Sequence, residues 1–164
     1  LWDCVRPVAE AALNDFIAMR TAEGARIRED LLAKCDAILE LVSFVEARSP
    51  QTVEEYRARL YEKMQEVLQT ANVDEQRILT EAAIYADKVA VDEETVRLRS
   101  HITQLKQFLN SDTAIGRKMD FLVQEMNREA NTIASKCSNV DIASKVVEIK
   151  SEIEKIREQI QNIE

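Results

Sequence analysis

In the middle of the chain, several carboxylates lie at helical spacing from one another or from the one histidine. In VDEETVRLRSH, Glu94 and His101 are seven residues apart, two turns along one helix face, with Arg97 between them. In QEMNREANTIASK, Glu125 and Glu129 are four residues apart and therefore lie side by side. A few carboxylates with one imidazole suit Mg²⁺ or Mn²⁺ better than zinc. The spacing therefore indicates a candidate metal or acid–base site on two helices.

The same residues also have a structural interpretation. Acidic side chains at a helix start, such as Glu94, commonly complement the helix dipole. Glu125 and Glu129 interrupt an apolar helix face, where burial is costly unless the carboxylates are paired or bind a cation. The basic partners available to them are Arg97, Arg117 and Arg128. His101 would then be a hydrogen-bonded helix residue, and the spacing by itself leaves both interpretations open.

Other catalytic chemistries have no signature in the chain. One histidine cannot form a two-histidine metal motif, and the two glycines stand alone, which excludes a Gly-rich phosphate loop. Cys4, Cys35 and Cys137 are far apart without a C-x-x-C pair, which predicts reduced thiols in a cytoplasmic protein and not a zinc site. No apolar stretch is long enough to cross a bilayer, and the charged opening residues differ from a signal peptide. We expect no membrane partner.

The elements that position these side chains are predicted to be helices, so the expected fold class is all-α. Hydrophobic residues make up 46% of the chain and aromatic residues 5%, with 2 Gly and 2 Pro, and so few helix breakers favour long helices. Apolar spacing predicts a helix over residues 8–47 that Ser49-Pro50 ends, and a second helix capped by Thr52. We expect these two to form a long antiparallel hairpin within residues 1–72, as an arm or lid.

Residues 73–164 are predicted to form a C-terminal helical domain that carries the candidate site. Asp74 and Asp92 are candidate helix caps, and polar breaks at 110–112 and 138–139 separate further helices. The last helix carries an apolar seam with alternating spacings of four and three: Ile142, Val146, Ile149, Ile153, Ile156, Ile160 and Ile163. Such a coiled-coil-like seam needs a partner helix, either from this chain or from another copy.

Charge is distributed unevenly along the chain. The net charge of -8 argues against non-specific nucleic-acid binding by the chain as a whole. Residues 97–136 nevertheless carry 7 Lys/Arg against 4 Asp/Glu. This local excess of positive charge is a weak indication of a phosphate-facing surface.

Several longer segments have a recognisable pattern. They are GRKMDFLVQEMNREANTIASK, VEIKSEIEKIREQIQNIE, EETVRLRSHITQLKQFL and FIAMRTAEGARIREDL. The first two resemble the C-terminal signature of the YicC/YloC family of bacterial endoribonucleases, the third the segment before it, and the fourth the family's central M-R-x-x-E-G region. The resemblance covers nearly the whole chain. It implies the C-terminal helical half of a protein roughly twice this length, preceded there by a mixed α/β domain.

The resemblance implies an endoribonuclease that uses a divalent metal, Mn²⁺ or Mg²⁺, and assembles as a hexamer around its RNA, with no DNA substrate expected. The residues that match the family pattern and are expected as metal ligands or acid–base groups are Glu94, His101, Glu125 and Glu129. The expected RNA contacts are Arg97, Arg117, Arg128, Asn131 and Lys136. Attack on the phosphodiester would come from a metal-bound water or from a 2′-hydroxyl deprotonated by His101.

Two other functions compete with the nuclease. This half of the family fold could serve only to build the oligomer, with the chemistry elsewhere; the isoleucine seam and the acidic residues before position 91 favour that role. It could also bind RNA as an adaptor without cleaving it, in which case no metal is needed. The cluster of carboxylates around His101 favours chemistry within residues 91–136.

Overall fold

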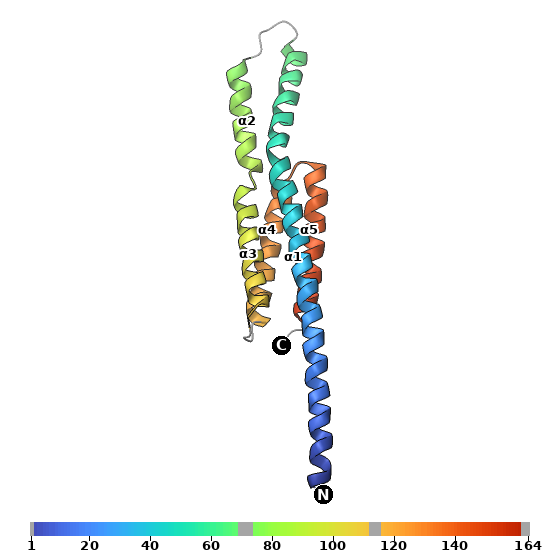
Figure 1. The fold of residues 1–164 in the computed structure, drawn as a ribbon. Helices are drawn as coiled ribbons and strands as arrows, with labels where there is room; N and C mark the ends of the chain where they lie inside the picture. Colours follow the sequence, from blue (N-terminus) through green and yellow to red (C-terminus); the bar gives the residue numbers. More distant parts are fainter. Residues whose placement is uncertain (1, 69–73, 112–115, 162–164) are drawn as a thin grey trace.

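The computed structural model describes residues 2–68, 74–111 and 116–161, which form helices and no strand (Figure 1). In chain order the described helices are α1 (Trp2–Leu68), α2 (Glu75–Val89), α3 (Asp92–Leu109), α4 (Gly116–Lys136) and α5 (Val140–Ile160). The predicted all-α class is confirmed. In the part of the chain that the structure describes, no helix is both long and apolar enough to cross a membrane.

The first helix is continuous, so the predicted hairpin within residues 1–72 is wrong. Pro50 lies inside α1 and does not end it. Proline removes one backbone hydrogen bond from an interior turn. Val45 and Thr52 are buried on either side of it, and the Thr52 hydroxyl donates to the Ser49 carbonyl over 2.6 Å. Packing and local side-chain bonding therefore override a helix-breaking signal.

The C-terminal part of α1 pairs instead with α2, and Figure 1 shows the two helices running side by side. The rings of Tyr56 and Tyr85 stack between them, with centroids 3.9 Å apart. Asp74 caps α2 as predicted, because its carboxylate accepts from the backbone N–H groups of Gln76 and Arg77. The connection between α1 and α2 lies outside the described residues.

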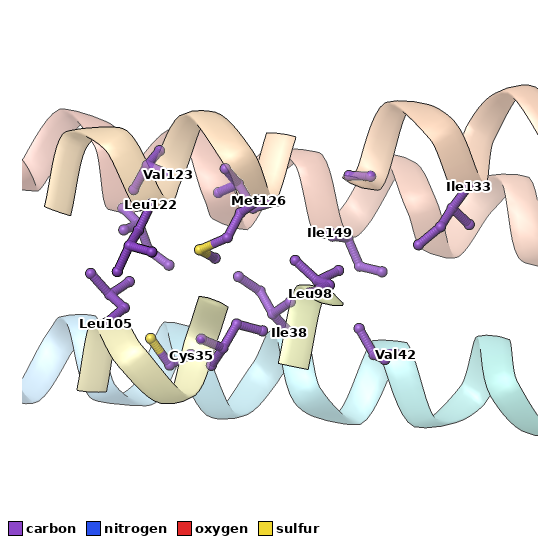
Figure 2. Packing of buried hydrophobic residues seen from close by; sticks show 14 of the residues in the cluster. Cys35, Ile38, Val42, Leu98, Leu105, Leu122, Val123, Met126, Ile133 and Ile149 are labelled. Atoms are coloured by element: carbon purple, nitrogen blue, oxygen red, sulfur yellow. The ribbon is translucent and has the colours of Figure 1, made fainter. Parts of the chain in front are cut away.

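One apolar core joins α1 to α3, α4 and α5 (Figure 2). The residues labelled in that view are Cys35, Ile38, Val42, Leu98, Leu105, Leu122, Val123, Met126, Ile133 and Ile149. Because residues 31–45 share this core with the helices after position 91, a boundary at residue 72 does not separate two cores. Burial raises the pKa of the Cys35 thiol to about 11, so this side chain packs as a protonated, apolar group.

The isoleucine seam of α5 is buried, as its spacing predicts. From Ile142 to Ile160 its described members are at most 5% exposed. The helices packed against α5 are α1 and α4 of the same chain, so this seam finds its partner without a second copy. Asn139 caps the helix by accepting from two backbone N–H groups of the first turn. Ile163 lies outside the described residues.

The N-terminal part of α1 projects beyond the bundle (Figure 1). Every residue from 2 to 26 is exposed, and the first core residue of the helix is Leu31. Trp2 is 69% and Phe16 50% exposed, which is unusual for aromatic side chains. Residues 2–26 are therefore a bare segment of α1, whereas the helix from Leu31 onward contributes to the core.

Candidate metal centre

The candidate site lies where α3 packs against α4. Each helix presents apolar side chains at spacings of three and four, such as Leu98, Ile102 and Leu105 on α3. Residues near the start of α3 contact residues near the end of α4, so the two helices run antiparallel. Polar side chains that interrupt these apolar faces are consequently brought to the same interface.

One polar layer of this interface contains three of the predicted ligands. His101 of α3 and Glu125 and Glu129 of α4 each offer one ligand atom, and these atoms lie within 4.8 Å of one another. Two donors bound to one Mg²⁺ or Mn²⁺ are about 3 to 4 Å apart, so a small torsional adjustment would let all three reach one cation. Among the described residues, this is the group of three that the structure brings together.

Burial makes this layer unusual. The Glu129 side chain is only 5% exposed, and Glu125 and His101 are partly buried. The Nδ1 atom of His101 is buried and has no hydrogen-bond partner within the described residues. A buried nitrogen without a partner costs free energy, and a bound cation is one way to satisfy it.

Arginines neutralise the two carboxylates only loosely. Arg97 approaches Glu129 at 3.9 Å, and Arg128 approaches Glu125 at 3.6 Å, both beyond ordinary hydrogen-bond length. Arg97 also forms a closer ion pair with exposed Glu93. The structural interpretation, in which arginines pair these carboxylates, is therefore realised in part. The pairs are long and their arginines are exposed to solvent, so the layer keeps its capacity for a cation.

Glu94 belongs to a different polar layer of the interface and lies outside the group of His101, Glu125 and Glu129, although the sequence predicts all four as ligands of one site. Its Oε1 accepts from Lys136 Nζ over 2.7 Å, and the same ammonium donates to the Ala90 carbonyl over 3.0 Å. Glu94 Oε2 is buried without a partner in the described structure. The lysine therefore holds the α2–α3 junction against the end of α4, and its contact with RNA stays a prediction.

The remaining predicted residues fall on the surface of α4. Arg117 and Asn131 are exposed, and neither lies in the cluster of His101 and the two glutamates. Asp92 is the first residue of α3 and not its cap, because Val91 occupies the cap position without a side-chain hydrogen bond. The acidic first turn still complements the helix dipole.

Sequence similarity relates the chain to a family of known proteins. The sequence model described as "Endoribonuclease YicC-like, C-terminal" matches residues 45–164. A protein of Clostridioides difficile named "Probable endoribonuclease YicC" is 48% identical over 165 residues, covering 100% of this chain and 56% of that protein. The chain belongs to the YicC family. A protein of Haemophilus influenzae, also named "Probable endoribonuclease YicC", is 40% identical over 152 residues, covering 93% of this chain and 52% of that protein.

The extent of these matches bears on the site. The YicC C-terminal match contains α3 and α4, and with them all of the candidate ligands. Similarity to the Clostridioides difficile protein extends through α1 as well, because it covers the whole chain. The chain spans about half the length of the curated YicC relatives that it matches.

The sequence predicted Glu94, His101, Glu125 and Glu129 as ligands of one site, and the structure brings three of them together, His101, Glu125 and Glu129. The separation of Glu94 from that site was not foreseeable from spacing within one helix. It depends on the register of α3 against α4, which places Lys136 opposite Glu94. A signal was present in the sequence, since a lysine at a helix end can reach a carboxylate at the start of an antiparallel neighbour.

Proposed function

We propose that this chain is the C-terminal part of a divalent-metal-dependent endoribonuclease, and that His101, Glu125 and Glu129 hold the metal. The observation that carries the proposal is the convergence of these three side chains at a partly buried helix interface. Membership of a family whose curated relatives are named probable endoribonucleases supports the reaction class. RNA is the proposed substrate, and DNA is not.

The donor set fits a hard divalent cation. Two carboxylates and one imidazole supply oxygen and nitrogen ligands without thiolate, which favours Mn²⁺ or Mg²⁺. The imidazole of His101 also has a buried nitrogen, Nδ1, without a hydrogen-bond partner among the described residues, and a ligand bound to the ring would offset that cost. Three protein ligands also leave coordination positions for water and substrate, as catalytic sites require.

A bound divalent cation would supply Lewis acidity toward a phosphodiester oxygen and an attacking water. The residues around the cation would hold it in place and orient the RNA. Glu125 and Glu129 would hold the positive charge, and Arg97 and Arg128, which pair with them and are 51% and 73% exposed, would face the RNA. Guanidinium groups there can orient phosphate oxygens in a fork geometry. Arg117 and Asn131 are proposed to contact RNA farther along α4.

The decisive experiment measures cleavage of a labelled structured RNA with Mn²⁺, Mg²⁺ or EDTA. It uses this chain alone and a chimera in which the chain replaces the matching half of the Clostridioides difficile relative. We expect metal-dependent cleavage that His101→Ala or Glu125→Gln abolishes in whichever form is active. Glu154→Gln, which removes an exposed carboxylate of α5, is the matched control. Full activity of the His101 and Glu125 variants would refute the proposed centre.

A second candidate function, assembly without catalysis, is favoured by the bare segment of α1. Trp2, Val5, Phe16 and Met19 are exposed large apolar side chains at heptad-like spacing on one helix. An isolated helix segment of this length is marginal in water, so a partner would stabilise it. A homo-oligomer, such as the hexamer implied by the family resemblance, would supply one.

The assembly role predicts that sedimentation detects an oligomer that Phe16→Glu dissociates. Thr21→Glu, on the same exposed segment, is the control for added charge. If the oligomer depends on Phe16 while His101→Ala leaves cleavage by the chimera unchanged, this half of the molecule serves assembly alone.

A further inference from the structure

Arg97 occupies a position between two carboxylates of different burial. Its guanidinium pairs with Glu93, which is exposed one turn earlier on α3, and lies 3.9 Å from buried Glu129 of α4. The Arg97 side chain itself is half exposed. The Nη1 atom of the guanidinium thus lies toward the candidate metal centre, and about half of the side chain is accessible to solvent.

The contact with Glu129 is the weaker of the two. A separation of 3.9 Å is too long for a hydrogen bond, so charge attraction is the main interaction. A half-exposed charge is screened by water, and displacing it costs little. Glu93 would meanwhile keep the guanidinium near the centre, because that pair is closer and lies on the same helix.

We propose that Arg97 and the divalent cation compete for Glu129, so that cation binding releases Arg97 to bind a phosphate group of the RNA. This inference rests on the proposed function, since it requires the metal centre. Once a cation neutralises Glu129, the two positive charges repel and the guanidinium turns to solvent, where an anion is favoured. Metal and RNA binding are then positively coupled, and the coupling is reciprocal.

The other basic groups of the site cannot take this role equally well. Lys136 is engaged by Glu94 and the Ala90 carbonyl. Arg128 pairs with Glu125 from its own helix, and that carboxylate is more exposed than Glu129. Arg97 is the guanidinium that reaches a buried carboxylate of the cluster from the opposite helix.

The test measures Mn²⁺ affinity by electron paramagnetic resonance, with and without a short 2′-O-methyl oligoribonucleotide whose integrity is checked on a gel. Without RNA, Arg97→Gln should bind Mn²⁺ about 3- to 10-fold more tightly, the effect expected from removing a partly screened charge nearby. The RNA should tighten Mn²⁺ binding by the wild-type chain and do so much less for the variant. Arg97→Lys keeps the charge and should stay near the wild-type Mn²⁺ affinity.

Arg57→Gln is the matched control. Arg57 is also about half exposed and pairs with an exposed glutamate of its own helix, but it lies on α1 outside the cluster. Its Mn²⁺ and RNA affinities should not change. Circular dichroism and melting verify that each variant folds.

The outcomes separate the two proposals. If the wild-type chain does not bind Mn²⁺, the metal centre itself fails and the competition fails with it. If the wild-type chain binds Mn²⁺ but Arg97→Gln does so with unchanged affinity, only the competition is overturned. An equal loss of RNA affinity with and without Mn²⁺ in Arg97→Gln also overturns it, because Arg97 would then bind phosphate independently of the metal.

Discussion

Two polar layers of the same α3–α4 interface differ in how closely their buried carboxylates are paired with a cation. In one, Glu94 is 7% exposed and is neutralised by Lys136 at 2.7 Å. In the other, Glu129 is as deeply buried, but its cationic neighbour Arg97 is 3.9 Å away, and Glu125 and His101 face it. The first layer contains a cation that neutralises its carboxylate, whereas the second has more ligand atoms than its nearby cations neutralise.

The difference indicates which layer is structural and which is suited to a ligand. A close, partly buried ion pair fixes the register of two helices and is costly to break. Two carboxylates and an imidazole that no close cation neutralises tend to be destabilising until something binds them. Sites that sacrifice stability in this way are candidates for function.

The largest effect is expected from Glu129→Gln. Mn²⁺ affinity should fall more than about 100-fold, since even outer-shell partners of a metal are worth about 10- to 100-fold. In the absence of metal the variant should be at least as stable as the wild type, because a buried charge without a close partner is removed. Calorimetric titration and urea unfolding measure the two quantities. A strongly destabilised variant that still binds Mn²⁺ would reverse the assignment of the layers.

Lys136→Met should show the opposite pattern. Its free energy of unfolding should drop by about 2–3 kcal/mol, because the buried Glu94 carboxylate loses its cation. Mn²⁺ affinity should remain within a few-fold of the wild type, apart from any loss due to unfolding. A Glu94→Leu/Lys136→Met double variant should recover most of the lost stability, since the stranded charge is gone. A Lys136 variant that keeps its stability but loses RNA binding would instead support the predicted contact of Lys136 with phosphate.

A smaller effect is expected at a third ion pair, between Arg99 and Glu46, which serves as a reference for the other two. Arg99 of α3 donates two hydrogen bonds to Glu46 of α1, at 2.9 and 2.7 Å, and about a third of each side chain is exposed. Hydrogen bonding from Arg99 lowers the pKa of the Glu46 carboxyl, against the opposing effect of burial. Arg99→Gln should therefore cost only about 0.5–1 kcal/mol near neutral pH, after allowance for solvent screening.

The pH dependence of that pair has a definite sign. A carboxyl whose pKa is lower in the folded state stabilises the fold above its unfolded pKa, about 4.3, and this contribution is lost as pH falls through the folded value. The stability difference between wild type and Arg99→Gln should thus shrink below about pH 4. Urea unfolding from pH 7 to pH 3 measures it. A difference that grows on acidification would contradict the assigned pair.

Much of the fold followed from local patterns. The spacing of apolar residues predicted the all-α class and the buried seam of α5, and the caps at Asp74 and Asn139 lie at the predicted breaks. The predicted hairpin is absent because Pro50 lies inside α1 and does not end it. An interior proline costs about 3 kcal/mol, and the packing around Val45 and Thr52 outweighs it.

Helical periodicity is enough to identify the side chains that interrupt the apolar faces, because it places His101, Glu125 and Glu129 beside core positions whatever the helices pack against. Which of these side chains meet depends on how the helices pack against one another. The register of α3 against α4 sets Lys136 opposite Glu94 and leaves the other three together. That register results from the fit of many core side chains at once, and no spacing within a single helix contains it.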